Sequence, residues 1–400
     1  MRRFVFVTAA AAALFSCQKP MFDSMPRGYE RSPLALSSKT AEEAEPAIPD
    51  SKVKPGIYYT AVQFPHWADW REGDFRGAEV VLYRDSIEIA SAPGGPRPGQ
   101  ERIRLWEGHL WSDIADGGET VVYCDGYPYL TIPEEVLLKG LVTENGNIHT
   151  LGQRPGSQGV SYRVNGEELF SSSSGAVLGG MYLDQGRVFY TFGIPVKRGE
   201  SVIMEYHVMQ GADERAVVTE TGTGKIYDIR VRDGTLYRCE RRTGESSSLC
   251  IVTGDQYVSV GAGADEPIHQ CNLIWLDGEV MIKGYSVFVT GYLHWIRSRE
   301  GYKYFAYTHQ VTDLYADGDA FAYVSVDRNG LAKEIVLGEE TVDLGQDRPK
   351  LMNSRGADFR DGTFAAAFTD PESTDNRVYM GGKWVYLDFN GYFTSLTIIK

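Results

Sequence analysis

The chain has 400 residues and a formal net charge of −14, from 40 Lys and Arg against 54 Asp and Glu. This charge argues against a nucleic-acid partner and against electrostatic docking on anionic lipid. The 42% hydrophobic and 24% charged residues exclude a disordered chain and a multi-span membrane protein. The 24 Tyr, 17 Phe and 7 Trp, together with 44 Gly, favour many short strands joined by tight turns.

An export signal is predicted over residues 1–16. A cationic Met-Arg-Arg start is followed by twelve uncharged, mostly apolar residues, too few to cross a bilayer as a helix. The segment ends in Leu-Phe-Ser-Cys at positions 14–17, which resembles the lipobox of bacterial lipoproteins. The resemblance implies cleavage before Cys17 and lipidation of its sulfur, so that a lipid anchor makes the membrane a partner. In the alternative interpretation the signal is an ordinary secretory one and Cys17 has no role.

The next segment, residues 17–56, is expected to be a lipidated Cys17 followed by a flexible tether. It is rich in Pro, Ser, Glu, Lys and Ala and shows no sustained apolar period. Residue 18 is Gln rather than Asp, so the lipoprotein resemblance favours the outer membrane; either face of it, periplasmic or surface, is open.

Residues 57–400 are predicted to form one all-β repeat domain. Short alternating apolar segments are separated by Asp-Gly, Asn-Gly or Gly-Gly pairs, which supply the two positive φ angles of a type I′ hairpin turn. Successive turn glycines lie 20 residues apart from Gly126 to Gly186, and longer units of two hairpins span 38–48 residues. That length is typical of a four-stranded propeller blade.

The predicted architecture is therefore a β-propeller of about seven four-stranded blades, with six or eight as further possibilities. The segment Ile57–Val62 is expected to pair with Phe393–Ile399 and close the ring without a free edge. The alternative is a pair of β-sandwich domains, since sandwiches also show turns every 8–12 residues or so.

Three segments carry a further resemblance: Tyr285–Tyr292 (YSVFVTGY), Asn376–Val385 (NRVYMGGKWV) and Asp313–Tyr323. They resemble repeats of uncharacterised propeller-like lipoproteins of Gram-negative gut bacteria. The resemblance implies the fold and the anchoring, and it brings no catalytic residues with it.

The sequence contains no spacing typical of a metal site or a cofactor site, so no metal, no cofactor and no catalytic residue is predicted. Cys239 and Cys250 flank a ten-residue segment and are predicted to form a cross-hairpin disulfide. His66, Trp67 and Trp70 lie in a polar stretch between two strands and are candidates for a stacking platform for sugars or peptides; the alternative is that they pack as a cap.

These observations favour a non-catalytic binding module at the cell envelope, whose partner is a glycan, a peptide or another lipoprotein. The alternative is a glycan-active propeller enzyme of the glycosidase or lyase class, whose acid and base the sequence does not identify. Convergent carboxylates and an arginine at the channel mouth would favour the enzyme, and an exposed aromatic patch over an uncharged pocket would favour the binding module.

Overall fold

The computed structural model describes the greater part of the predicted repeat domain, and it places no part of the predicted export signal or of Cys17. The described residues are 54–66, 77–93, 103–107, 109–116, 118–154, 159–172, 175–220, 224–242, 248–261, 266–309, 313–329, 331–345, 356–369 and 375–399. Within these ranges no helix is present that could cross a membrane.

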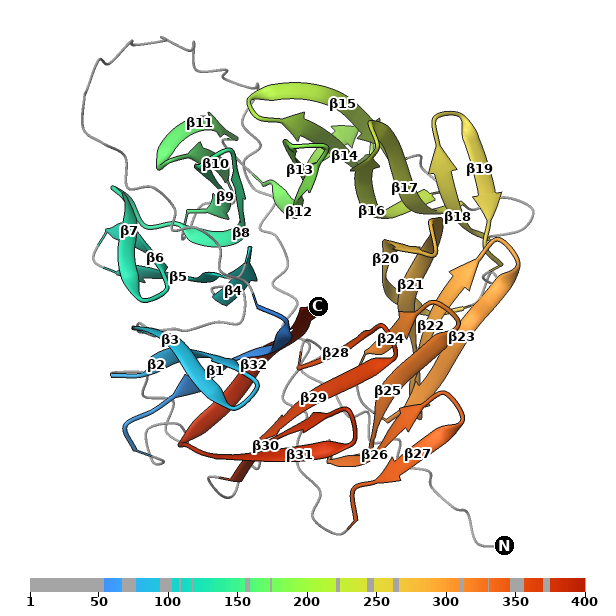
Figure 1. Ribbon diagram of the computed structural model, residues 1–400. Coiled ribbons are helices and arrows are strands. Elements are labelled where there is room, and N and C mark those ends of the chain that lie inside the picture. Colours follow the sequence, from blue (N-terminus) through green and yellow to red (C-terminus); the bar gives the residue numbers. More distant parts are fainter. Residues whose placement is uncertain are drawn as a thin grey trace, which may run out of the picture.

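The strands form eight antiparallel sheets of four strands each, arranged in a ring (Figure 1). The described residues contain β-strands and no helix. The predictions of an all-β chain and of a β-propeller are confirmed, and the two-sandwich alternative is wrong. The blade number is eight, one of the stated possibilities beside the favoured seven.

Seven blades are consecutive in the chain, and the first strand of each lies nearest the ring axis (Figure 1). Their strands are, for blade 1, β4 (Ile103–Trp106), β5 (His109–Asp116), β6 (Glu119–Cys124) and β7 (Tyr127–Ile132); for blade 2, β8 (Leu137–Glu144), β9 (Asn147–Gln153), β10 (Val160–Val164) and β11 (Glu167–Ser171); for blade 3, β12 (Val177–Asp184), β13 (Arg187–Arg198), β14 (Ser201–Gln210) and β15 (Asp213–Thr219); for blade 4, β16 (Gly224–Arg232), β17 (Thr235–Arg242), β18 (Ser248–Thr253) and β19 (Gln256–Ser259); for blade 5, β20 (Ile268–Leu276), β21 (Glu279–Phe288), β22 (Gly291–Ser298) and β23 (Gly301–Thr308); for blade 6, β24 (Leu314–Asp317), β25 (Ala320–Val326), β26 (Ala332–Leu337) and β27 (Glu340–Asp343); and for blade 7, β28 (Ala357–Arg360), β29 (Thr363–Thr369), β30 (Asp375–Met380) and β31 (Lys383–Asp388).

Blade 8 joins the two ends of the chain. Its inner strand is the C-terminal β32 (Gly391–Ile399), and its outer strands are β1 (Gly56–Gln63), β2 (Glu79–Arg84) and β3 (Ile87–Pro93). β1 pairs with β32 from Gly56 opposite Ile399 to Gln63 opposite Gly391. The predicted pairing of the two ends is confirmed, and it closes the ring by completing the eighth four-stranded sheet.

Both faces of each blade are buried against a neighbour. Eight apolar clusters fill the ring, and each cluster draws its residues from two adjacent blades. β1 illustrates the pattern: Tyr59 and Ala61 face blade 7, while Tyr58 and Val62 face blade 1. Side chains alternate along a strand, so a strand buried on both faces needs large residues at consecutive positions.

Buried or half-buried aspartates link successive blades. Asp228 of β16 accepts a hydrogen bond from the backbone N of Leu273 in the next blade at 2.9 Å. Asp358 of β28 does the same to the backbone N of Ile398, also at 2.9 Å. Each carboxylate thus satisfies an amide of the adjacent inner strand that the blade itself leaves unpaired.

The two faces of the ring differ in their connections. All first-to-second and third-to-fourth strand connections within blades 1–7, and the β2–β3 connection, are two residues long. Many are the predicted type I′ turns, with both residues at positive φ, such as Asn145–Gly146 (50° and 79°). The remaining connections lie on the opposite face and reach 15 residues between β1 and β2. We call this the long-loop face; it is where a site can be built without disturbing the blades.

Candidate functional site

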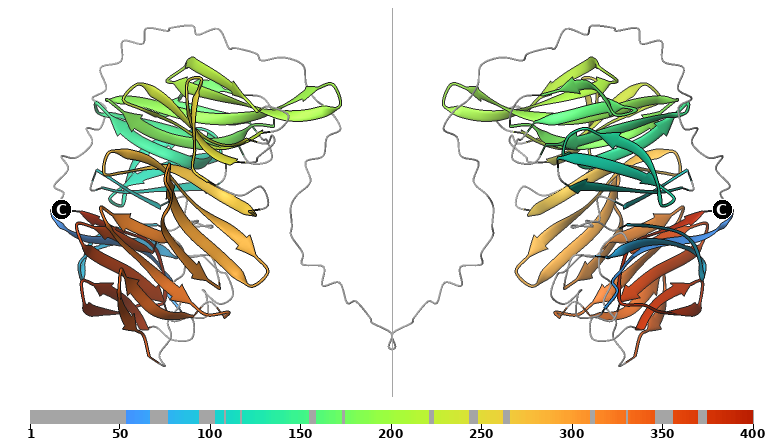
Figure 2. Two further views of the ribbon diagram at one scale, coloured as in Figure 1. Left: turned by 90° about the vertical axis from the view of Figure 1, so that its right-hand side faces the viewer. Right: turned by 90° about the vertical axis from the view of Figure 1, so that its left-hand side faces the viewer.

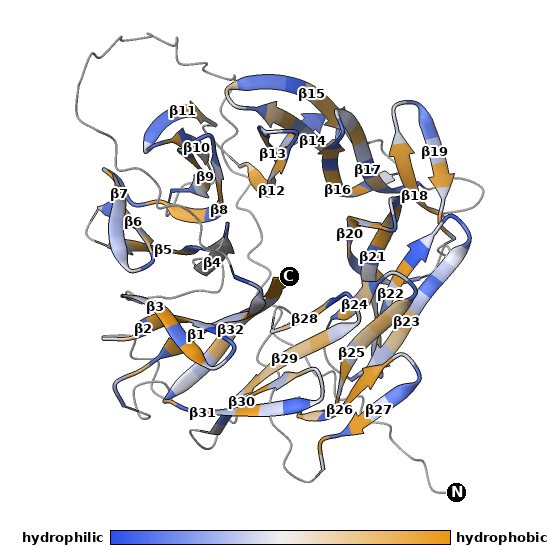
Figure 3. Ribbon diagram, in the orientation of Figure 1, coloured by the Kyte–Doolittle hydropathy of each residue, from blue (hydrophilic) through white to orange (hydrophobic). Residues whose placement is uncertain are grey.

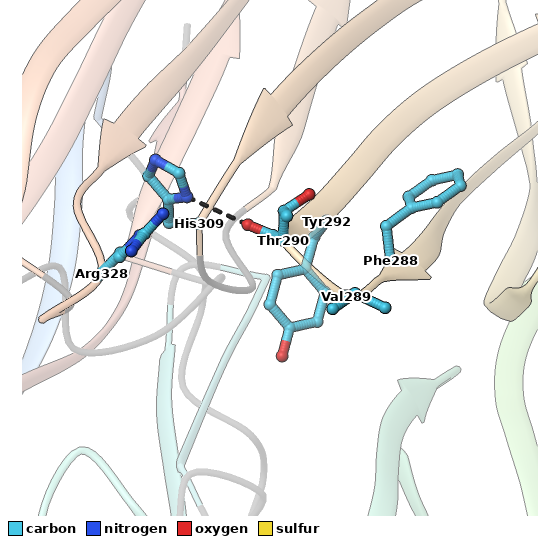
Figure 4. A pocket seen from close by; sticks show the side chains of 7 residues that line it. Phe288, Val289, Thr290, Tyr292, His309 and Arg328 are labelled. Carbon is cyan, nitrogen blue, oxygen red and sulfur yellow. Dashed lines mark hydrogen bonds between the residues drawn. The ribbon is translucent and has the colours of Figure 1, made fainter. Parts of the chain in front are cut away.

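A pocket of about 650 Å³ opens on the long-loop face, where blade 5 meets blade 6 (Figure 4). Its residues come from three places: the β21–β22 turn with the strand ends beside it, the segment after β23 and the segment after β25. The residues that line it are Phe288, Val289, Thr290, Gly291, Tyr292, His309 and Arg328. No single strand forms this site, because its walls belong to two adjacent blades.

The β21–β22 turn is held in place by side chains of the outer strand. The Tyr307 hydroxyl donates a hydrogen bond to Thr290 Oγ1 at 2.7 Å. His309 Nδ1 lies 3.2 Å from the carbonyl oxygen of Thr290, so this nitrogen carries a proton and donates it to the turn (Figure 4). At Gly291 a Cβ would lie 2.4 Å from the carbonyl oxygen of Thr308, so only glycine lets β22 start this close to β23.

Aromatic rings support the pocket wall from behind. The Tyr285 ring meets the Tyr292 ring edge to face, with centroids 6.1 Å apart. Tyr285 also stacks on His269 at 5.3 Å and lies 5.5 Å from His294. Burial raises the pKa of Tyr285, so it stays a neutral phenol at physiological pH. These contacts fix the orientation of Tyr292, a ring that can pack against a ligand.

The pocket has one side with the charged Arg328 and one apolar side. Arg328 and His309 lie together on one side, and Phe288 and Val289 lie on the other (Figure 4). Phe288 is 42% exposed and Val289 is fully exposed. Among the described residues that line the pocket none is Asp or Glu. The arrangement can bind an anionic group of a ligand on one side and an apolar or sugar-ring surface of the same ligand on the other. The pair of carboxylates that glycoside hydrolysis uses is not among these residues.

One residue of the predicted aromatic platform is described, and it lies on the same face of the ring. His66 is exposed and lies in the β1–β2 connection of blade 8. Trp67 and Trp70 lie outside the described residues, so the platform stays a prediction. Two residues before His66, Phe64 is buried and its ring lies 6.2 Å from that of Tyr392. Cys17, the predicted lipid attachment site, also lies outside the described residues.

The pocket residues were not identified from the sequence. The sequence marks Tyr285–Tyr292 only as a repeat, and His309 and Arg328 are isolated polar residues at strand ends. One signal was available: the two-residue β21–β22 turn consists of Val289 and Thr290 instead of Asn-Gly or Asp-Gly. A Val-Thr pair at the tip of a hairpin departs from ordinary turn chemistry, and such departures are expected at functional or strained sites.

The four cysteines after Cys17 are buried free thiols in the structure. Cys239 stands opposite Ile251 in the β17–β18 register, whereas Cys250 stands opposite Glu240. Neighbouring positions point to opposite faces of a sheet, so the register argues against the predicted disulfide between Cys239 and Cys250. The reason is that the spacing of the two cysteines around a turn does not determine which face each one occupies.

One cluster of possible metal ligands occurs in the described part of the chain, at the β6–β7 turn. His109, Cys124 and Asp125 place one donor atom each within 4.8 Å of one another. His109 Nδ1 lies only 2.6 Å from Asp125 Oδ2, and Asp125 Oδ1 accepts from the backbone N of Leu110 at 2.7 Å. Two ligands at zinc distances in tetrahedral geometry stand roughly 3.3 Å apart. The cluster is therefore organised as a hydrogen-bonded turn anchor.

No family model and no curated protein matches the sequence. Among solved structures, the chain is similar to dihydro-heme d1 dehydrogenase NirN, with 12% identity over 91% of this chain and 78% of that one and a TM-score of 0.49. It is also similar to the β-propeller domain of the Trilobed protease from Pyrococcus furiosus, with 10% identity over 78% and 88% and a TM-score of 0.42. A third similar structure is that of the polysaccharide lyase Uly1, with 10% identity over 85% of this chain and 98% of that one and a TM-score of 0.36.

These likenesses concern the propeller architecture, and their low identities carry no functional argument. The fold and the pocket together define an eight-bladed β-propeller with a ligand-sized hollow on its long-loop face.

Proposed function

We propose that this protein is a lipid-anchored β-propeller of the outer membrane that binds a glycan without catalysis. In this proposal the binding site is the pocket between blades 5 and 6, and the bound sugar carries a carboxylate. Lipidation at Cys17 would hold the ring at the membrane, with residues 17–56 as the tether. A peptide and a partner lipoprotein, the other candidate ligands, are outcomes that the binding test below can reveal.

The observation that carries the proposal is the placing of Arg328 and His309 across the pocket from exposed Phe288 and Val289. A guanidinium binds a carboxylate through paired N–H donors, which a neutral sugar does not match. The protein has a net charge of −14, so a cationic pocket opposes the overall field and selects a negative group locally. The aromatic and apolar side suits the C–H face of a sugar ring.

The test is titration of the purified full-length protein with oligosaccharides of a uronic acid and with the matching neutral oligosaccharides. We expect binding of the acidic series only. Arg328→Gln should weaken it at least tenfold, because a charge-assisted pair contributes about 1.5–3 kcal/mol. Arg198→Gln is the matched control, since Arg198 is an exposed arginine at the β13–β14 turn of the same face.

Three results would decide against the proposal. Equal affinity for acidic and neutral sugars would remove the role of Arg328. Binding of peptides in place of sugars would move the protein to another ligand class. Shortening of the oligosaccharides during the titration would favour the enzymatic alternative, in which other residues of the long-loop face supply the acid and the base.

A further inference from the structure

Cys239 and Cys271 bring two thiols together across the interface of blades 4 and 5. Cys239 lies on β17 and Cys271 on β20, and their sulfur atoms are 3.3 Å apart. Both side chains are buried, with exposed fractions of 0% and 1%. A disulfide has an S–S length of about 2.0 Å, so the sulfurs must approach by only about 1.3 Å. The surrounding cluster contains Trp295, Leu273 and Ile251, and it is apolar.

The backbone around this pair is shaped to admit it. A Cβ at Gly284 would lie 2.6 Å from Cys271 Cβ and 2.8 Å from the Trp295 ring. Glycine at this position of β21 therefore leaves the space in which Cys271 sits, directly across the strand pair from it. The position of Cys271 is fixed by backbone packing, and its sulfur is aimed at Cys239.

The other described cysteines do not compete for this pairing. Cys250 points to the opposite face of blade 4, where its sulfur lies 3.3 Å from Ser248 Oγ. Cys124 belongs to blade 1 and packs in the cluster between blades 1 and 2. Of the three possible pairings of four cysteines, the structure brings together the sulfurs of Cys239 and Cys271.

We propose that Cys239 and Cys271 form a disulfide that covalently joins blades 4 and 5 in the exported protein. The bond requires an oxidant, and the chemical class is a disulfide oxidant of the cell envelope. One cysteine thiolate attacks the oxidant's S–S bond and forms a mixed disulfide, and the second thiolate displaces the oxidant as a dithiol. Two electrons and two protons pass to the oxidant in this exchange.

The bond forms before the core between the two blades closes. Burial raises the pKa of the Cys239 thiol well above its ordinary value, and the thiolate is the reactive species. In the folded ring both sulfurs are also out of reach of a protein oxidant. The same burial shields the finished disulfide from reductants. The linkage encloses residues 240–270, which contain β18, β19 and the connection from blade 4 to blade 5.

The experiment uses the full chain, exported with its own signal, with free thiols trapped by alkylation before lysis. Non-reducing peptide mapping is expected to show Cys239 linked to Cys271, with Cys124 and Cys250 alkylated after denaturation. Cys250→Ala and Cys124→Ala are matched controls that keep the link. Cys239→Ala and Cys271→Ala should each lose it and leave the partner alkylated. Reduction should lower the melting temperature of the wild type and leave that of Cys239→Ala unchanged.

The proposal depends on export, which belongs to the proposed function, so membrane fractionation accompanies the mapping. Free Cys239 and Cys271 in the membrane fraction overturn the disulfide, as does a link between Cys239 and Cys250. If the chain stays in the cytosol, export is wrong and the disulfide is decided by refolding with oxidised glutathione. A link between Cys239 and Cys271 then supports the pairing, and its absence overturns it.

Discussion

The guanidinium of Arg297 is fully buried, and its Nη2 donates to both carboxylate oxygens of Glu266, at 2.7 and 2.6 Å. Arg297 lies on β22 of blade 5, whereas Glu266 lies in the connection that arrives from blade 4. Arg297 Nη1 donates to the carbonyl oxygen of Gly261 in the same connection at 2.8 Å. The guanidinium also faces the rings of Trp295 and Tyr302, at 4.6 and 4.0 Å. One arginine of blade 5 thus anchors the connection from blade 4 to blade 5.

Arg297→Met is expected to lower the free energy of unfolding by about 3–5 kcal/mol, because it leaves the largely buried Glu266 carboxylate without its counter-ion. Urea denaturation measures the change. The control is Arg198→Met, which breaks the pair of Arg198, 61% exposed, with Glu205 and should cost less than about 1 kcal/mol. The double variant Arg297→Met with Glu266→Leu should recover part of the loss. Equal effects of Arg297→Met and Arg198→Met would contradict the interpretation.

The architecture could be predicted from the sequence because turn chemistry repeats. Asp233–Gly234 and Asp277–Gly278 are type I′ turns at equivalent places of two blades. The blade count was harder to obtain, because strands vary from the four residues of β4 to the twelve of β13. Blade 8 is also split between the two ends of the chain, so no continuous segment contains it.

The pocket could not be predicted because its residues form no motif and show no characteristic spacing in the sequence. His309 and Arg328 become neighbours only when blade 6 packs beside blade 5. The positions of the cysteines depend on similar contacts: sequence spacing places Cys239 near Cys250, whereas strand alternation and blade stacking place its sulfur against that of Cys271. Local patterns predict local structure, and both of these features depend on contacts between blades.

Gly291→Ala should damage the pocket through the backbone. The new Cβ would meet the carbonyl oxygen of Thr308 at 2.4 Å and the Tyr307 hydroxyl at 2.7 Å, so β22 must move away from β23. We expect a loss of about 1–3 kcal/mol in the free energy of unfolding and weaker binding of acidic sugar. Gly180→Ala is the control, because its Cβ would have its nearest contact at 3.6 Å, with Arg230. Unchanged stability and affinity for Gly291→Ala would show that the turn tolerates the displacement.

The aromatic platform predicted at Trp67 and Trp70 can be tested separately from the pocket. Replacing both residues with alanine should reduce the signal of the full-length protein on a glycan array, because the loss of each large ring removes contact area with the bound sugar. Tyr386→Ala serves as the control, since Tyr386 is 66% exposed on β31, outside the long-loop connections. An unchanged binding profile in the double variant would reject the platform and leave the two tryptophans a packing role.

His149 predicts how stability depends on pH. His149 lies on β9 and its side chain is buried. Its Nδ1 lies 2.6 Å from the Tyr162 hydroxyl of the neighbouring strand β10. Burial lowers the pKa of His149 from 6.5, against the opposing effect of the Glu144 carboxylate, 3.9 Å from Nε2. Below pH 6.5 the unfolded chain therefore binds a proton at His149 more readily than the folded chain does, and the free energy of unfolding falls as the pH decreases.

His149→Gln should remove this contribution, which is at most about 1.4 kcal/mol for each pH unit. Urea denaturation at pH 7, 6 and 5 compares the variant with the wild type and with His66→Gln, a control at an exposed histidine. We expect the wild type and His66→Gln to lose stability more steeply between pH 7 and 5 than His149→Gln. Parallel pH profiles for all three proteins would mean that His149 takes up its proton in the folded state as readily as in the unfolded chain.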